Sequence, residues 1–429
     1  MPEAAPVMIA VLSFNRMRPS IGLQASTLFV PMGIGYERGM SYPLSSAVCG
    51  VEAAPIATVR ALVSGRSFPA ERPLIDLTQA APSYPPPAAL TEHLAARLAD
   101  PALHRYGDIL GVPALREAYA AHLAAFHRTT IEPSQVAITA GCNQAFCAAM
   151  MALAAAGSSV LLPRPHYFNH AMWLRMLGVR PVPLDFRDGS GAVPDPADAE
   201  ALIDATTRAI VLVSPNNPSG ATYPPEVIEA FYALAKRRRI ALVLDETYKD
   251  FLPEGTRPHR IFDDPDWPGT LIHLYSFSKV YALPGHRVGA LTAGTAAIAE
   301  IEKVMDCVAI CAPRSGQEAA LYGLRHLAGW ARERIAAVVA RGRAFGDLLA
   351  SSNRWRLVSL GAYFAYLEHP FAGTAAMDVV RQLAEAQHLL LLPGTTFGEG
   401  QERFVRLAYA NVADAVIPEV VARLDAATR

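Results

Sequence analysis

The feature of this sequence that most constrains its fold is the alternation of short apolar strands with helical segments between residues 136 and 292. Strands that alternate with helices form a mostly parallel sheet covered by helices on both faces, and such a sheet binds ligands at the carboxyl ends of its strands. We therefore predict an α/β fold whose functional residues follow the strand ends. The strands are expected at residues 136–139, 159–163, 180–184, 209–213, 240–244, 271–275 and 288–292, with helices beginning near Cys142, Asn169 and Ala197.

The pattern changes beyond about residue 315. A long helix is expected at residues 317–350, with Gly329 as a candidate kink. Strands and helices that no longer alternate regularly predict a smaller α+β domain. Its strands are expected at residues 363–368, 389–393 and 404–409, with one helix between the first two and a closing helix.

The N-terminal part of the chain is expected to contribute to both domains. One short amphipathic helix, interrupted by Pro55, is predicted within residues 43–62. The predicted divisions are a poorly ordered extension at residues 1–42, an arm with part of the small domain at residues 43–102, a large domain at residues 103–315 and a C-terminal small domain at residues 316–429.

Charge and hydropathy exclude several classes of function. The chain has 38 Lys and Arg against 39 Asp and Glu, so nothing in its net charge favours nucleic acid or an anionic membrane as a partner. Hydrophobic residues make up 52% and charged residues 18%, which is typical of a well-buried globular protein. No apolar run approaches the roughly 18 residues of a membrane span, and residues 1–14 lack the basic start of a secretory signal.

The cysteines predict a reducing compartment, and hence the cytoplasm. Their number is odd and they fall in apolar, helix-like segments, which favours buried free thiols. Cys307 and Cys311 are four residues apart, but no second His or Cys pair completes a metal site, so no metal is predicted. The five are Cys49, Cys142, Cys147, Cys307 and Cys311.

The stretch at residues 274–291, LYSFSKVYALPGHRVGAL, gathers groups suited to a phosphate and an aldehyde. A lysine amine forms a Schiff base with an aldehyde, and it is a good nucleophile when burial or crowding lowers its pKa. Lys279 is one of only four lysines in the chain, so it is needed as an amine rather than as a general positive charge. Arg287 supplies a second positive charge and a forked grip on phosphate, with the hydroxyls of Ser276 and Ser278 nearby. The alternative at this point is an ordinary surface turn.

Three further motifs stand where predicted strands end. Residues 139–143, TAGCN, open a helix and direct backbone N–H groups at an anion. Residues 214–220, SPNNPSG, place the amide of Asn217 at the mouth of a strand, although a plain turn would read the same way. Residues 245–248, DETY, end an apolar strand with Asp245, a carboxylate that is unfavourable to bury unless a positive group pairs with it.

Single residues near these motifs are weaker candidates. The ring of Tyr167, in PHYFN, could face a flat ligand, and Arg406, which ends the strand FVRL, could pair with a carboxylate. The small side chains of Ala80 and Ala81 would let the backbone approach a ligand, or belong to an ordinary proline-rich connector. Tyr106 lies on a loop before a predicted helix, where a tyrosine is more typical of packing than of chemistry.

Taken in order, these residues resemble the class I and II aminotransferases, which are fold type I pyridoxal-phosphate enzymes. The resemblance covers residues 43–429 and implies a mostly parallel, seven-stranded-type sheet between helices with a smaller α+β domain. It also implies transfer of an amino group from an L-amino acid to a 2-oxo acid, in a homodimer with shared active sites. The elements that carry it are Tyr106, Gly141, Tyr167, NNPSG, DETY, SFSK, Arg287 and Arg406.

The resemblance implies roles for individual residues. Lys279 would form the internal aldimine with pyridoxal 5′-phosphate and move a proton between Cα and C4′, while Asp245 would keep the pyridine nitrogen protonated. Tyr248 and Asn217 would hydrogen-bond the phenolate oxygen, and Tyr167 would stack on the ring. The phosphate would be held by Gly141, Cys142, Asn143, Ser276, Ser278, Arg287 and, from the partner subunit, Tyr106. The substrate would be bound by Arg406, which clamps its α-carboxylate, with Asn217 and Ala81.

Two departures and several alternatives accompany the resemblance. Cys142 stands where the family usually has a small residue or a hydroxyl, and no arginine for a second substrate carboxylate can be identified. The same cofactor residues would also serve a C–S β-lyase, a decarboxylase or a cyclase. A regulator with a DNA-binding head is less favoured, because residues 1–42 contain only three arginines as bases and no helix-turn-helix pattern. A dehydrogenase is less favoured still, because no GxGxxG opens a helix after a strand.

Overall fold

The computed structural model describes residues 42–351 and 354–428. Its internal contacts divide the chain into residues 1–44 and residues 45–429, and the elements below belong to the second unit. The predicted extension at residues 1–42 lies, apart from Tyr42, outside the described residues.

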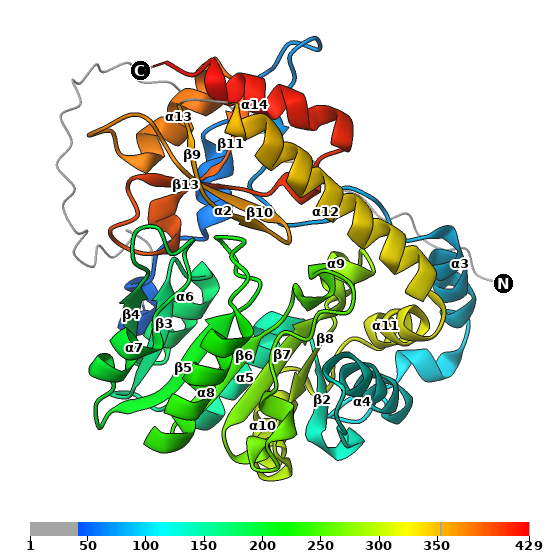
Figure 1. Ribbon diagram of the computed structural model, residues 1–429. Coiled ribbons are helices and arrows are strands. Elements are labelled where there is room, and N and C mark those ends of the chain that lie inside the picture. The colour runs from blue at the N-terminus through cyan, green and yellow to red at the C-terminus, as the bar shows by residue number, and fades with distance from the viewer. Residues whose placement is uncertain (1–41, 352–353, 429) are drawn as a thin grey trace. The chain divides into compact units, whose positions relative to one another are not determined.

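A seven-stranded sheet forms the centre of the larger half of this unit, as predicted (Figure 1). Its strand order is β2-β8-β7-β6-β5-β3-β4, and β8 runs in the opposite direction to the other six strands. The strands begin and end within one or two residues of the predicted positions. They are β2 (Val136–Thr139), β3 (Ser159–Arg164), β4 (Arg180–Asp185), β5 (Thr207–Val213), β6 (Ala241–Asp245), β7 (Leu271–Ser276) and β8 (Gly289–Thr292).

Helices cover both faces of this sheet because its strands are apolar on both sides. Side chains alternate between faces along a strand. Leu242 and Leu244 of β6 therefore join the core on one face, and Val243 joins the core on the other. The first core also contains residues of α3 (Ala88–Arg97), α4 (Pro113–His127), α7 (Pro196–Leu202), α8 (Pro225–Arg238) and α11 (Arg314–His326). The second contains residues of α5 (Cys142–Leu153), α6 (Phe168–Met176) and α10 (Thr295–Ala309).

A smaller antiparallel sheet of four strands lies beside the large one, in the order β12-β13-β10-β9. The long helix α12 packs on β9 and on the closing helix α14, and in Figure 1 it runs from the small sheet towards α11. The elements are β9 (Arg356–Gly361), β10 (Phe364–Glu368), β12 (Leu392–Pro393), β13 (Phe404–Leu407), α12 (Ala328–Ala350), α13 (Ala376–Ala386) and α14 (Ile417–Asp425).

Three local predictions for this region need correction. The strand expected at residues 389–393 is two short strands, because β11 (Leu389–Leu390) pairs with β1 (Ile75–Asp76) whereas β12 pairs with β13. The helix expected at residues 317–350 is two helices that meet at Leu327, whose backbone leaves the helical region (φ −109°, ψ 16°). Strand β9 was not predicted.

The N-terminal arm forms two helices, α1 (Ser46–Cys49) and α2 (Pro55–Ala61), rather than one. Pro55 begins the second helix, a position where its missing N–H group leaves no hydrogen bond unmade. The division at residues 43–102, 103–315 and 316–429 stays a prediction.

The five thiols are free, but the prediction that they are buried is wrong for Cys49 and Cys307, which are exposed. Cys49 ends α1, whose residues are exposed or half-buried, and Cys307 lies on the outer face of α10. Cys142, Cys147 and Cys311 are half-buried. Within residues 42–351 and 354–428, no helix combines the length and the apolar composition that a membrane span requires.

The two sheets touch at the end of the turn at residues 214–220. Gly220 has a positive φ of 75°, and a Cβ atom there would lie 2.5 Å from the carbonyl oxygen of Phe364. A Cβ atom on Gly361 would overlap the carbonyl oxygen of Gly220. Ser359 also donates a hydrogen bond of 2.7 Å to the carbonyl oxygen of Ser219. The last glycine of the SPNNPSG motif is therefore required by the packing of one backbone on another.

Candidate active site

A cavity of about 390 Å³ lies at the carboxyl ends of β5, β6 and β7, between the large sheet and Arg406 of β13. Its position is the one expected for a ligand site in such a sheet. Gly141 and Tyr106 do not line it. The predicted site residues that do are Ala81, Cys142, Asn143, Tyr167, Asn217, Asp245, Tyr248, Ser276, Ser278, Lys279, Arg287 and Arg406.

Lys279 reaches the cavity from α9 (Phe277–Val280), a single helical turn directly after β7. The Ser276 hydroxyl begins this turn by accepting a hydrogen bond from the Ser278 backbone N–H, 3.2 Å away. The Lys279 amine donates a hydrogen bond to the carbonyl oxygen of Ala80. Burial, reinforced by the positive charges of Arg287 and Arg406, lowers the pKa of Lys279 to about 8. A useful fraction of this amine is therefore unprotonated, and nucleophilic, near neutral pH.

Asp245 presents a buried carboxylate that has few partners. Its Oδ1 atom accepts a hydrogen bond from the Thr247 backbone N–H at 2.9 Å, and its Oδ2 atom accepts one from the Cys142 thiol at 3.5 Å. No basic side chain in the described part of the chain forms an ion pair with it. Burial accordingly raises the pKa of Asp245 above its ordinary value. A carboxylate in this state is best satisfied by a ligand that brings a protonated nitrogen.

The guanidinium of Arg287 lies at the N-terminus of α5, next to Gly141. Gly141, the residue before α5, has a φ of 82°, and a Cβ atom there would overlap the guanidinium of Arg287. Gly141 therefore makes room for the arginine instead of lining the cavity. Arg287 is exposed, and one of its N–H groups donates to the carbonyl oxygen of Pro284 at 3.0 Å. Guanidinium and helix N-terminus together suit a phosphate group.

Tyr167 and Tyr248 are the aromatic rings predicted to contact a ligand. The Tyr167 hydroxyl donates a hydrogen bond of 3.5 Å to Asn143 Oδ1 and accepts one of 3.2 Å from Asn169 Nδ2. The Tyr248 ring is buried, with its centroid 5.9 Å from the Lys279 amine. Burial raises the pKa of Tyr248 well above its ordinary value, so its hydroxyl stays protonated and can donate a hydrogen bond.

Arg406 is a buried cation without a carboxylate partner among the residues that the structure describes. Its guanidinium donates to Asn217 Oδ1 at 3.3 Å and to the carbonyl oxygen of Thr78, and it lies over the rings of Phe364 and Phe397. Its Nε–H group is buried and has no acceptor within residues 42–351 and 354–428. Burial lowers the pKa of Arg406 to about 10, which still leaves it charged at neutral pH. This side chain is therefore poised to bind an anion.

Tyr106 does not reach the cavity of its own chain. Its side chain is 78% exposed, and its backbone carbonyl accepts a hydrogen bond of 3.5 Å from Arg314. A role in a neighbouring subunit stays a prediction.

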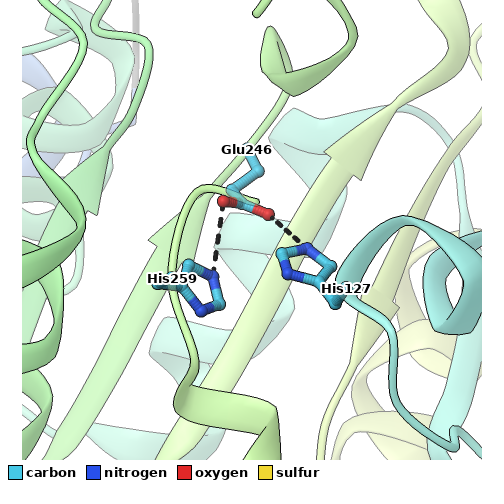
Figure 2. Close-up of side chains that lie close together, drawn as sticks. All are labelled: His127, Glu246 and His259. Atoms are coloured by element: carbon cyan, nitrogen blue, oxygen red, sulfur yellow. Dashed lines mark hydrogen bonds and ion pairs between the residues drawn. The ribbon is translucent and has the colours of Figure 1, made fainter. Parts of the chain in front are cut away.

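Sequence reasoning missed a buried cluster directly behind Asp245. Glu246 points to the other face of the sheet, where its Oε2 atom accepts hydrogen bonds from His127 Nε2 at 3.0 Å and from His273 Nε2 at 2.9 Å. His259 Nε2 lies 3.4 Å from its Oε1 atom (Figure 2). Strand alternation after Asp245, together with a histidine inside the apolar strand LIHLY, could have signalled this cluster.

His127, Glu246 and His259 are close enough together to hold a metal ion, but their hydrogen bonding opposes it. The Ile261 backbone N–H donates to His259 Nδ1 at 3.2 Å, so the proton of this imidazole sits on Nε2, the atom that a metal would need. Burial lowers the pKa of His127 to about 3, which keeps it neutral. Burial would raise the pKa of Glu246, but His127 and His259 more than offset this and hold it well below its usual value. The imidazole N–H groups of His127 and His273 hold the Oε2 atom of Glu246, whereas its Oε1 atom faces His259 without a hydrogen bond among the described residues.

Comparisons with known proteins agree with this architecture. The family model described as aminotransferase class I and II matches residues 72–424. The aromatic aminotransferase ISS1 of Arabidopsis thaliana is 27% identical over 388 residues, covering 89% of this chain and 95% of that protein. The aspartate aminotransferase of Pyrococcus horikoshii is 28% identical over 363 residues, covering 82% and 90%. A Thermus thermophilus aspartate aminotransferase solved with maleate has a TM-score of 0.82 at 25% identity, covering 90% of this chain and 99% of that one.

Proposed function

Since this chain belongs to the aminotransferase class I and II family and is a transaminase, we propose that it moves the amino group of an L-amino acid to a 2-oxo acid with pyridoxal 5′-phosphate bound at Lys279. One observation carries the proposal. An amine of lowered pKa, a carboxylate without a cation and two guanidinium groups all line one cavity.

The unmatched charges of the cavity fit this cofactor. Asp245 would hold the proton of the pyridine nitrogen, because the ion pair would compensate a carboxylate whose pKa is raised by burial. Arg287, the N-terminus of α5 and the hydroxyls of Ser276 and Ser278 would hold the phosphate. When bound, pyridoxal phosphate supplies an electron sink for the negative charge that develops at the substrate Cα.

Lys279 would bind the aldehyde carbon and then move a proton at the substrate Cα. A pKa of about 8 suits both tasks, because the amine accepts and returns a proton near neutral pH. The hydroxyl of Tyr248 and the amide of Asn217 would donate hydrogen bonds to the ring oxygen, and Tyr167 would pack against the ring face. These groups fix the ring relative to the amine.

Arg406 would bind the substrate α-carboxylate beside Ala81. Its guanidinium is held from one side by Asn217 and from the other by the aromatic rings of Phe364 and Phe397. The unpaired Nε–H group and the positive charge make a carboxylate the natural ligand. The printed names of the relatives include aromatic and aspartate aminotransferases, so they leave the amino donor open.

A homodimer with shared active sites is proposed on the exposure of Tyr106, whose hydroxyl would reach a phosphate in the partner. Two exposed free thiols, Cys49 and Cys307, support a reducing compartment such as the cytoplasm. Replacement of Tyr106 by Phe should weaken cofactor retention, measured by dialysis and absorbance. A catalytically competent monomer in light scattering would contradict the shared site.

The decisive experiment is to trap the cofactor on its lysine. Purified protein with pyridoxal phosphate should absorb in the visible, and borohydride reduction followed by peptide mass spectrometry should place the adduct on Lys279. The Lys279→Ala variant should lose the adduct, and Lys303→Ala, which removes an exposed lysine paired with Glu300, should keep it. An adduct on another lysine of the wild-type protein would reject the assignment.

Product analysis separates transfer from the other reactions of such a site. Incubation with a panel of amino acids and 2-oxoglutarate or phenylpyruvate should convert the acceptor to its amino acid. Release of ammonia with pyruvate would indicate a lyase, and release of carbon dioxide would indicate a decarboxylase.

A further inference from the structure

The cavity contains four charged side chains, and the proposed function uses every one of them. Within the described residues that line it, the basic side chains are Lys279, Arg287 and Arg406, and the acidic side chain is Asp245. In the proposed function, Lys279 binds the aldehyde and Arg287 binds the phosphate. Arg406 binds the substrate α-carboxylate, and Asp245 pairs with the ring nitrogen. None of the charges that the described residues of this chain bring to the cavity is left for the side chain of the substrate.

The rest of the lining is apolar or carries neutral amides and hydroxyls. Ile56 of α2 and Phe168 of α6 contribute apolar surface, Ala80 and Ala81 add no polar side chain, and Gln79 adds a neutral amide. Asn143 already accepts a hydrogen bond from Tyr167. These groups can contact an apolar or amide side chain, but they cannot neutralise a carboxylate or an ammonium group.

Two arginines outside the cavity, Arg341 and Arg164, are held by other partners. Arg341, near the loop after Ala81, pairs with Asp414 at 2.5 Å and donates to Ser83 Oγ at 3.1 Å and to the Ala410 carbonyl at 3.0 Å. Arg164, beyond Phe168, donates to both carboxylate oxygens of Asp185, at 2.6 and 2.7 Å. Turning either of them towards the substrate would break an existing ion pair.

From this distribution of charge we propose that the enzyme acts on amino acids whose side chains are uncharged at neutral pH, and discriminates against aspartate, glutamate and lysine. The proposal rests on the proposed function and names its substrate class. A second carboxylate would be buried in a cavity whose cations are already paired, where an unpaired charge is strongly unfavourable. Because an amide is nearly isosteric with a carboxyl group, the discrimination is expected within pairs of equal size.

Single half-reactions test this class without interference from the acceptor. Holoenzyme is mixed with asparagine or aspartate, glutamine or glutamate, and methionine or lysine, and conversion of the cofactor to its amine form is followed by stopped-flow absorbance. The uncharged member of each pair should react with an apparent second-order rate constant at least about 100-fold higher. Aspartate or glutamate reacting within tenfold of its amide would overturn the inference while leaving amino-group transfer intact. A protein that converts none of the six and no other uncharged amino acid would overturn both.

Equilibrium binding gives a second measure that does not depend on turnover. Amino acids methylated at Cα have no proton to lose, so they bind without being converted. Spectral titration with 2-methylleucine and with 2-methylaspartate should give dissociation constants that differ at least about 100-fold in favour of the first. Equal or tighter binding of 2-methylaspartate would show that a further cation, for example from a second copy of the chain, completes the cavity, and the inference would fail.

Discussion

Asp245 and Glu246 are adjacent at the end of β6, yet their carboxylates lie in opposite electrostatic environments. Asp245 faces the cavity, accepts hydrogen bonds from a thiol and one backbone N–H, and has a pKa raised by burial. Glu246 faces the opposite core, where imidazole groups of His127, His259 and His273 surround it and its pKa is lowered. Burial is shared, so the difference lies in the partners. A buried carboxylate without an ionisable partner indicates a ligand site, and one surrounded by imidazole groups indicates a structural role.

The basic residues repeat this contrast. Lys249, only four residues from Asp245, is fully buried but donates to Asp250 Oδ1 at 3.1 Å and lies 3.9 Å from the ring centroid of Phe126. Arg406 is equally buried and has no carboxylate within the described part of the chain. Both side chains are buried, so burial does not distinguish them. The presence of an acidic partner marks Lys249 as structural, and its absence marks Arg406 as a candidate for binding a ligand.

Removing the charge of Asp245 should have the largest effect on activity and the smallest on stability. Asp245→Asn is expected to lower kcat/KM by about 10³-fold, because the amide cannot hold the ring nitrogen protonated. The free energy of unfolding of the cofactor-free variant should equal or exceed that of the wild type, because an unpaired buried charge is lost. Steady-state kinetics and urea unfolding measure the two quantities. Unchanged turnover would contradict the role of Asp245.

Substitution of the neighbouring Glu246 should affect stability strongly and activity weakly. Glu246→Gln is expected to lower the free energy of unfolding by about 3 kcal/mol, because the imidazole N–H groups lose an ionised acceptor. Activity per folded molecule should stay within roughly tenfold, since Glu246 does not line the cavity. Glu52→Gln, which removes an exposed ion pair with Arg175, serves as the control and should change stability by less than about 1 kcal/mol. If Asp245→Asn and Glu246→Gln had equal effects on activity and on stability, the contrast between the two faces of β6 would be contradicted.

Lowering the pH should reduce the free energy of unfolding, because of the buried histidine His127 beside Glu246. The pKa of His127 is about 3 in the folded chain, whereas an unfolded histidine titrates near 6.5. Between these values the unfolded chain binds a proton that the folded chain does not, so the free energy of unfolding falls as the pH is lowered from 6.5 towards 3.

The variant His127→Gln keeps an N–H donor but does not titrate. Between pH 6.5 and 4.5 the wild type should lose about 2 kcal/mol more stability than this variant, at roughly 1 kcal/mol per pH unit. Urea midpoints at pH 6.5, 5.5 and 4.5 measure the difference. Parallel curves would show that His127 is not kept neutral by burial.

The smallest effect is expected at Cys142, whose thiol donates to Asp245. Burial raises the pKa of Cys142 well above its ordinary value, so it remains a donor. Cys142→Ala should lower kcat/KM by about fivefold, and Cys142→Ser should restore most of it, in keeping with one hydrogen bond of about 1 kcal/mol. A loss in Cys142→Ala as large as that in Asp245→Asn would show that the thiol takes part more directly.

The large sheet could be predicted from the sequence, and candidate residues could be assigned to its strand ends, because both depend on local patterns. The alternation of apolar strands places each strand end, and Asp245, Lys279 and Asn217 follow such ends directly. The partners of Glu246 could not be predicted in the same way, because His127 lies 119 residues away and His273 lies 27 residues away.

The smaller sheet shows a second limit of local patterns. The apolar run at residues 389–393 carries no sign that its two halves pair with different strands, since those partners lie in β1 and β13. Tertiary packing, which no window of sequence contains, decides these pairings.

The contact between Gly220 and Gly361 joins the two sheets through their backbones. Because neither glycine has room for a methyl group, the turn after β5 and the small sheet that carries Arg406 meet backbone to backbone, with no side chain between them. The spacing of the two sheets that border the cavity therefore depends on this contact, and one added carbon atom at either glycine would change it.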